Sequence, residues 1–147
     1  MPNWVTNKIK VTASKELLDE FEKKYCRLDD EDNYFFDFDR VIPEPKTKDE
    51  CPKDYLNYEG SHIQEDEKRP WFNWYSWHNK YWGTKWNSCS NEIERTSKFR
   101  LELVFDTAWS IPKPVLKELV KQNPNIKFEF FYSEEWETKF HKLDIEG

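Results

Sequence analysis

The sequence predicts an α+β domain in which two β-α-β units contribute to one antiparallel sheet that carries two helices on one face. The first observation is the order of patterns, because strand, helix and strand patterns follow one another before residue 40 and again after residue 98. The second is the alternation of apolar and polar residues in the strand segments, as in a sheet with one solvated face. The third is the aromatic content of 18%, which supplies large apolar side chains to a chain of 147 residues that is otherwise highly charged. We therefore expect a single domain over 1–147.

The first half begins with a strand, a helix and a second strand. Apolar residues alternate with lysines over 5–12, which predicts the first strand. Ser14 can cap a helix over 15–25, because its hydroxyl can accept from a free N–H of the first turn. The aromatic run 34–39 predicts the second strand of the same sheet. Pro43 closes that strand, since proline cannot donate to a ladder.

Residues 40–98 are expected to form an excursion between the two halves. Its most unusual part is the aromatic segment that begins at Trp71, where aromatic residues recur at helical spacing and predict a helix over 71–82. Pro70 suits the start of this helix and Gly83 its end. The predicted aromatic face comprises Trp71, Trp74, Tyr75, His78, Tyr81 and Trp82.

The second half repeats the order of the first. Alternating apolar residues predict a strand over 99–105 and another over 126–132. Ser110 is a candidate cap for the helix 112–122 between them, and a short last strand is expected within 136–143. The complete pattern is that of a ferredoxin-like βαβ-βαβ sandwich with an aromatic-rich helical insertion between the halves.

Composition excludes several classes of protein. The chain has 23 basic and 29 acidic residues, and a net charge of −6 is unfavourable for general nucleic-acid binding. It contains no apolar run of about 18 residues that could span a membrane. Its first residues lack the basic and apolar regions of a signal peptide. We expect a cytoplasmic protein with no membrane association.

The sequence contains no recognisable catalytic, metal or cofactor motif. Cys26, Cys51 and Cys89 are widely spaced and are expected to be free thiols. No metal-ligand repeat and no glycine-rich phosphate loop is present, so we expect no metal, no cofactor and no enzymatic activity. One enzymatic alternative stays open, because Asp37 and Asp39 would lie on the same face of a strand as a carboxylate pair.

Four short motifs stand out in the sequence: Met1 to Trp4 with Thr6 and Asn7, Phe38 with Val41 to Pro45, Trp82 to Asn87, and Thr107 to Ser110 with Pro112. Together they resemble a known family, the YubB-like proteins of plasmids and phages. The resemblance implies a ferredoxin-like domain and an origin in a phage or another mobile genetic element, and it implies no established activity. The C-terminal end departs from the family, because Tyr132, Glu134, Glu135 and Phe140 are present without the glycines that usually accompany them.

Two of these motifs supply the candidate binding residues, and three interpretations of them remain open: a structural role, a pocket for a small ligand, and a protein-binding surface anchored by tryptophan. In a structural role, Trp82 and Trp86 fill the core and Lys85 pairs with Asp106. In a binding role, a cation, an amide and indole faces gather beside the start of the helix 112–122, where free N–H groups favour anions. The candidate residues for a ligand or a partner are Lys85, Trp86, Asn87, Thr107 and Trp109.

The sequence favours a non-enzymatic accessory binding protein of a phage or plasmid that acts through a host or element-encoded protein partner. The alternative is a binder of a small nucleotide or short single-stranded nucleic acid. Its site would be the segment 71–100, which has 5 basic and 2 acidic residues and is rich in aromatics. A further possibility is an acidic mimic of nucleic acid that uses 26–70, where 14 acidic residues face 7 basic ones.

Overall fold

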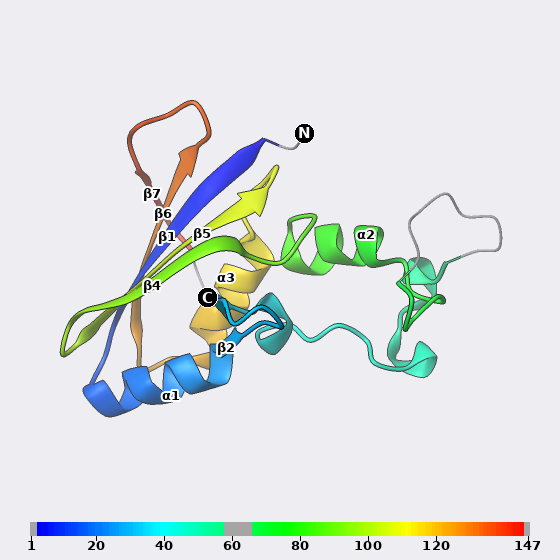
Figure 1. The fold of residues 1–147 in the computed structure, drawn as a ribbon, viewed down its shortest axis with the longest axis horizontal. Coiled ribbons are helices and arrows are strands. Elements are labelled where there is room, and N and C mark those ends of the chain that lie inside the picture. The colour runs from blue at the N-terminus through cyan, green and yellow to red at the C-terminus, as the bar shows by residue number, and fades with distance from the viewer. Residues whose placement is uncertain (1–2, 58–65, 146–147) are drawn as a thin grey trace.

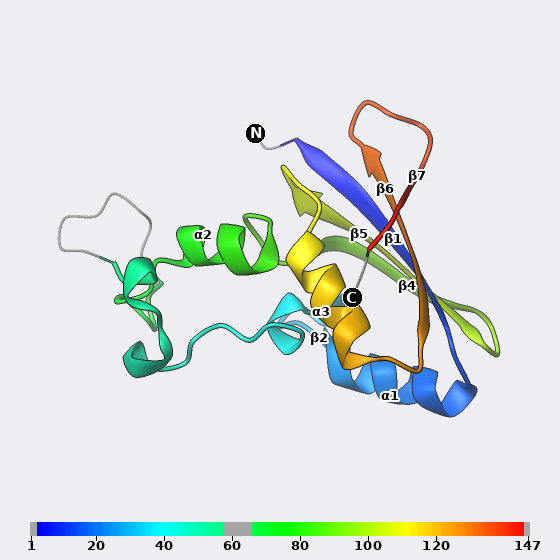
Figure 2. The ribbon, with the colours of Figure 1, turned by 180° about the vertical axis from the view of Figure 1, so that it is seen from behind.

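The computed structural model describes residues 3–57 and 66–145, and its centre is a five-stranded antiparallel sheet (Figure 1). The strand order is β4-β5-β1-β6-β7, so the N-terminal strand lies in the middle. Helices α1 (Lys15–Tyr25) and α3 (Lys113–Gln122) cover the same face of the sheet, as the view from behind shows (Figure 2). The strands are β1 (Trp4–Thr12), β4 (Cys89–Ser97), β5 (Arg100–Ala108), β6 (Lys127–Glu134) and β7 (His141–Leu143).

This arrangement confirms the predicted ferredoxin-like fold. One split β-α-β unit consists of β1, α1 and β4, and the other consists of β5, α3 and β6. Burial alternates strictly along β1, so one face of the strand points to the helices and the other to solvent. The core lies between that inner face and the two helices. Its central members include Ile9, Leu18, Leu101, Leu103, Phe105, Leu116 and Leu119.

The first helix forms where the sequence predicts it. The hydroxyl of Ser14 accepts from the backbone N–H of Leu17 at 3.2 Å, which caps the helix as expected. Leu18, Phe21 and Tyr25 are buried on its inner face. The predicted cap of α3 is different, because Pro112 occupies the N-cap position and Ser110 lies outside the helix.

The prediction that 34–39 is a strand of the main sheet is wrong. Strand β3 (Tyr34–Phe36) pairs instead with β2 (Cys26–Leu28) in a separate two-stranded sheet, and Phe38–Arg40 is a 3₁₀ turn. The turn begins because the carboxylate of Asp37 accepts from the N–H of Asp39 at 3.0 Å. Phe38 is thereby directed into the core, where it packs edge-on against Phe105. The second strand of the main sheet is β4.

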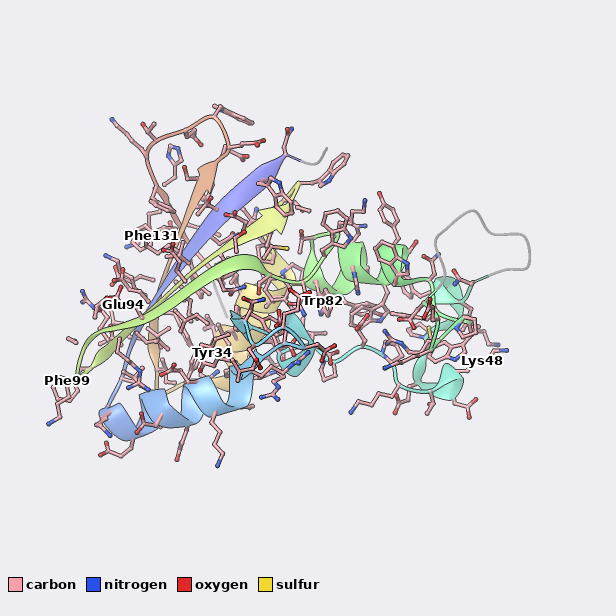
Figure 3. All side chains as sticks on the ribbon, in the orientation of Figure 1. Tyr34, Lys48, Trp82, Glu94, Phe99 and Phe131 are labelled. Atoms are coloured by element: carbon pink, nitrogen blue, oxygen red, sulfur yellow. The ribbon has the colours of Figure 1, made fainter. Side chains whose placement is uncertain are left out.

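The long excursion is therefore placed differently from the expected range 40–98. It occupies 26–88, between α1 and β4, and lies inside the first β-α-β unit (Figure 1). Two further 3₁₀ turns, Lys48–Glu50 and Lys53–Tyr55, lie in the part that extends farthest from the sheet. Lys48 marks that distant end in Figure 3.

The predicted aromatic helix is present but shorter and less regular. Helix α2 (Trp74–Trp77) begins after Asn73, whose side chain accepts from the N–H of Ser76, and continues as a π-helical turn over His78–Trp82. Gly83 ends the segment with φ 78°, as predicted. The wider turn brings Trp77 and Trp82, five residues apart, into contact at 5.6 Å between ring centroids. Trp77 is buried although the 3.6-residue period does not place it on the apolar face.

Candidate functional site

The two tryptophan motifs lie side by side where the excursion joins the sheet, beside Trp82 in Figure 3. Residues 83–88 lead from the aromatic helix into β4, and residues 109–112 lead from β5 into α3. The hydroxyl of Thr84 donates to the carbonyl of Ala108 at 2.7 Å. The hydroxyl of Ser110 donates to the carbonyl of Gly83 at 2.6 Å. The sequence-based expectation that both motifs meet at one place therefore agrees with these contacts.

The start of α3, expected to be an open corner for an anion, is covered by the chain itself. A Cβ at Gly83 would lie 2.5 Å from Cδ of Pro114, so the glycine backbone rests directly on the first turn of the helix. Pro112 and Pro114 also remove two N–H groups from that region. Ser110, the expected cap, binds Gly83 instead. The free N–H groups that would attract an anion are therefore few and shielded.

Thr107 is fully occupied by structural hydrogen bonds. Its side chain is completely buried, donates to the carbonyl of Ser110 at 2.7 Å and accepts from the side-chain amide of Asn7 at 2.9 Å. The two bonds hold the turn after β5 against the central strand. Thr107 therefore positions the residues that follow it and leaves no hydroxyl group exposed to a ligand.

Asn87 is occupied in a similar way. Its amide nitrogen donates to a carboxylate oxygen of Asp37 at 2.8 Å, and its amide oxygen accepts from the backbone N–H of Phe38 at 2.9 Å. Asp37 also accepts from Nε of Arg27 at 2.6 Å. These bonds tie the start of β4 to the 3₁₀ turn Phe38–Arg40 that follows β3.

Asp37 and Asp39, the candidate catalytic pair of the sequence analysis, both accept hydrogen bonds that stabilise the local backbone. Asp37 is buried with the partners just described, and Asp39 accepts from the backbone N–H of Glu44 at 2.7 Å. Burial raises the pKa of Asp39 above its usual value, and the nearby Glu44 carboxylate adds to the rise. Each carboxylate therefore accepts from a backbone N–H group in or just after the 3₁₀ turn that follows β3.

Lys85 and Trp86 form a cation–π pair. The ammonium of Lys85 lies 4.5 Å from the Trp86 ring centroid and 6.0 Å from that of Tyr75. The expected ion pair with Asp106 is absent between these two described residues, because Asp106 accepts from the hydroxyl of Thr6 at 2.8 Å. Lys85 and Trp86 are both half-buried.

Trp109 differs from the other candidates because its side chain is 65% exposed. Its φ of 76° lies in the left-handed region that bulky residues avoid. The backbone N–H of Trp109 donates to the carbonyl of Asn3 at 2.7 Å, which holds this conformation. Trp4 lies opposite Ala108 in the sheet and 6.1 Å from the ring of Trp86. We call Trp4, Trp86 and Trp109 the tryptophan rim.

Sequence reasoning missed two contributors to this region. Trp4 was considered only as part of the opening motif, and its place opposite Ala108 follows from the strand register. His78 is buried and stacks on Trp82 at 4.1 Å. Its Nδ1 lies 2.7 Å from the carbonyl oxygen of Lys85, and its Nε2 lies 2.7 Å from a carboxylate oxygen of Glu44. A lone histidine between tryptophans gives no sequence signal for these partners.

Within residues 3–57 and 66–145, no group of three or more His, Cys, Asp and Glu side chains is arranged to hold a metal ion. In the same residues, none of the helices has the length and apolar character needed to cross a membrane.

Comparison with known families identifies one match. Residues 81–140 match the family described as "Ferredoxin-like domain in Api92-like protein". The matched segment contains both tryptophan motifs, strands β4 to β6 and helix α3. No curated protein and no solved structure matches the chain. Topology and match together identify a ferredoxin-like domain that is similar to the one described in Api92-like proteins.

Proposed function

We propose that the protein is a non-enzymatic accessory binding protein of a phage or plasmid, similar to the YubB-like proteins, and that it binds a protein partner at the tryptophan rim. We place this activity in the cytoplasm of the host. The family match and the motif resemblance support the ferredoxin-like scaffold. The rim supports the mode of action, because tryptophan is enriched among the residues that dominate binding energy at protein interfaces, and Trp109 of the rim is exposed.

Trp109 carries the proposal. An L-residue in the left-handed region costs about 1–2 kcal/mol, and glycine would avoid that cost. Here a tryptophan occupies the position, and only about a third of its side chain is covered by the protein. The buried bonds of Thr107 and the bond from Trp109 to Asn3 fix the backbone beneath it. A strained backbone that presents a large indole to solvent is typical of a binding residue.

The hydrogen bonding of the neighbouring residues favours a protein partner over a nucleotide. Asn87 and Thr107 would have to break internal hydrogen bonds to bind a base or a phosphate. The start of α3 is covered by Gly83 and offers little to an anion. Lys85 is the cation of the two motifs, and its ammonium already lies over Trp86. A protein surface can use the indole faces without displacing any of these bonds.

The experiment uses a substitution that removes the indole of Trp109 and relieves the backbone strain at that position. Trp109→Gly suits the observed φ, so we expect a folded protein with unchanged or slightly higher stability. Phe99→Ser is the matched control, because Phe99 is also exposed and lies at the far tip of the β4–β5 hairpin (Figure 3). Nine residues of β5 separate the two sites, which corresponds to about 30 Å.

The proteins captured from a host lysate by the unmodified protein are purified and titrated against each variant by calorimetry. We expect a partner whose affinity falls at least about tenfold with Trp109→Gly and is unchanged with Phe99→Ser. Equal affinity for Trp109→Gly and the unmodified protein would refute the proposal. Stabilisation by nucleotides or short oligonucleotides that depends on Trp109, without a protein partner, would support the nucleotide alternative instead.

A further inference from the structure

Trp86 and Trp109 of the tryptophan rim belong to two segments of the chain that have no acidic residue. Residues 71–91 and 107–117 contain four lysines and neither Asp nor Glu, although 29 of the 147 residues of the chain are acidic. The two segments meet where the end of the aromatic helix lies against the start of α3. They thus contribute to one surface that is basic and rich in tryptophan. The lysines of this basic surface are Lys80, Lys85, Lys113 and Lys117.

Three of these lysines are grouped around Gly83, where Figure 2 shows the end of the aromatic segment beside the start of α3. Lys80 lies three residues before Gly83 in the π-helical turn, and Lys85 follows Gly83 by two residues. The backbone nitrogen of Lys113 lies 3.4 Å from the position of a Cβ on Gly83. The Cα atoms of the three lysines therefore lie within about 10 Å of Gly83. Trp109 is next in sequence to the hydroxyl that binds the Gly83 carbonyl, so its exposed indole starts beside these lysines.

The charges of these lysines are not neutralised by the described part of the protein. Lys80 and Lys113 are exposed, and neither they nor Lys85 form an ion pair within residues 3–57 and 66–145. An uncompensated positive surface favours a partner with negative charge at the point of contact. Several cations elsewhere do bind a carboxylate, among them Arg27, Arg69 and Arg95.

Lys85 is held in place while its N–H donors stay available. Its backbone carbonyl oxygen lies 2.7 Å from Nδ1 of His78, which fixes the loop, and its ammonium lies over Trp86 with the ring centroid of Tyr75 at 6.0 Å. Contact with a ring face satisfies none of the three N–H donors of an ammonium, and no oxygen of the described chain accepts from them. Because the half-buried side chain is already ordered, a carboxylate can bind it at little further cost in side-chain entropy.

This surface fits the carboxylates of a protein better than the phosphates of a nucleic acid. Its cations are single lysines spread around Gly83, and the two acid-free segments have no arginine for bidentate binding of phosphate. On the side of Trp4, the carboxylates of Asp106 and Glu135 line a neighbouring cleft. A long polyanion would be repelled there, whereas a short acidic segment of a protein can stay within the basic surface.

We propose that the protein partner docks on the basic surface through a short acidic segment, in which an apolar side chain packs on Trp109 and neighbouring carboxylates bind Lys85 and Lys113. This inference rests on the proposed function, because it names the chemistry of the partner that contacts the rim. The tryptophan supplies the apolar contact area, and the lysines orient the partner and speed its association.

The test uses the peptide acetyl-Glu-Glu-Leu-Glu-Glu-amide as the probe and the Trp109 indole N–H resonance as the readout, with the resonance assigned by Trp109→Gly. The control peptide acetyl-Gln-Gln-Leu-Gln-Gln-amide has nearly the same shape without the charges. We expect a saturable shift with the acidic peptide at millimolar concentration and low salt, and at least about tenfold weaker binding of the control peptide. Comparable binding of the two peptides, or no shift with the acidic one, would overturn the inference.

Two matched variants locate the binding. Lys85→Met removes the ammonium and keeps an unbranched stem against Trp86, so we expect the acidic peptide to bind about threefold more weakly. Lys98→Met is the control, because the ammonium of Lys98 also lies over a ring, that of Phe99 at the far tip of the β4–β5 hairpin. Equal affinities in the two variants would contradict the inference. If circular dichroism shows that Lys85→Met is unfolded, Lys80→Gln with Lys113→Gln, two exposed lysines, takes its place.

A short oligothymidylate tests the other class of anionic partner. We expect it to bind more weakly than the acidic peptide, because the surface offers no bidentate donor and no free helix start to phosphate. Tighter binding of the oligothymidylate that is lost with Lys85→Met would assign the surface to nucleic acid and overturn the inference.

The outcome is independent of the test of the proposed function. If the acidic peptide fails to bind while a partner still requires Trp109, the inference about the basic surface is wrong and the proposed function stands. If the peptide binds and depends on Lys85 but no partner requires Trp109, the surface has the inferred chemistry and the proposed function is wrong at the rim.

Discussion

The contact between Gly83 and α3 predicts a large loss of stability for a small substitution. A Cβ at position 83 would lie 2.5 Å from Cδ and 3.2 Å from Cγ of Pro114. The proline ring is part of the first helical turn and cannot rotate away as a flexible side chain could. Gly83→Ala therefore requires a shift of the backbone on one side of this contact.

The cost has three parts. The left-handed conformation costs about 1–2 kcal/mol for alanine. Overpacking against a rigid neighbour adds about 1–3 kcal/mol. Alanine also reduces the conformational entropy of the unfolded chain, which raises the free energy of unfolding by about 0.4–1 kcal/mol. The expected decrease in the free energy of unfolding is therefore about 3 kcal/mol.

Urea denaturation followed by circular dichroism measures this value. With a slope of about 2 kcal/mol per molar urea, the midpoint should fall by about 1.5 M. The second substitution Pro114→Ala removes the clash but leaves the backbone strain, so about two thirds of the cost of Gly83→Ala should disappear in the double variant. A cost below about 0.5 kcal/mol, or the same cost in both backgrounds, would refute the packing of this loop on α3.

Three other outcomes follow from buried groups. Trp82→Ala should cost about 3–5 kcal/mol in urea denaturation because its side chain is buried and its indole N–H donates to a backbone carbonyl, whereas exposed Tyr75→Ala should stay within about 0.5 kcal/mol. Asp37→Ala should lower the free energy of unfolding by about 1–3 kcal/mol, because the half-buried Asn87 amide and the backbone N–H of Asp39 lose their acceptor while half-exposed Arg27 stays solvated; a loss below about 0.5 kcal/mol would contradict this. Burial raises the pKa of Cys26 to about 12, and the neighbouring Glu22 contributes, so at pH 8 this thiol should react with a disulfide reagent only at the rate of global unfolding. Rapid labelling in native protein, followed by mass spectrometry, would contradict that expectation.

Elements with their own pattern were predictable from the sequence. Strands β1 and β6 each alternate in polarity, and α1 combines an apolar face with the Ser14 cap. The second strand was not predictable, because β4 is an edge strand with Ile93 as its one apolar residue beside a terminal cysteine. The position of β4 depends on backbone hydrogen bonds with β5. Backbone pairing of this kind requires no particular side chains, so the sequence does not reveal it. The aromatic run 34–39 has the composition of a buried strand, so it is predicted in place of β4 as the second strand of the main sheet.

The candidate site was predictable in position and not in chemistry. The two motifs were expected to meet, and the bond between Thr84 and Ala108 joins them. The partners of Asn87 and Thr107 come from Asp37 and Asn7, which are distant in sequence and have no pattern of their own. The π-helical turn also changed which aromatic residues are buried, because a single wide turn moves every later residue to another face.

The central position of β1 has a consequence for synthesis of the chain on the ribosome. Asn7 contacts Thr107, its partner 100 residues later, and the other neighbour of β1 is completed only at Glu134. At about 5–20 residues per second, β1 waits roughly 5–20 seconds with both edges unpaired, and its second edge stays open until β6 is made. Lys8 and Lys10 alternate with its apolar residues, and such charges hinder the pairing of exposed strands between chains. We therefore expect these lysines to reduce aggregation of the nascent chain before β5 and β6 are available to pair with β1.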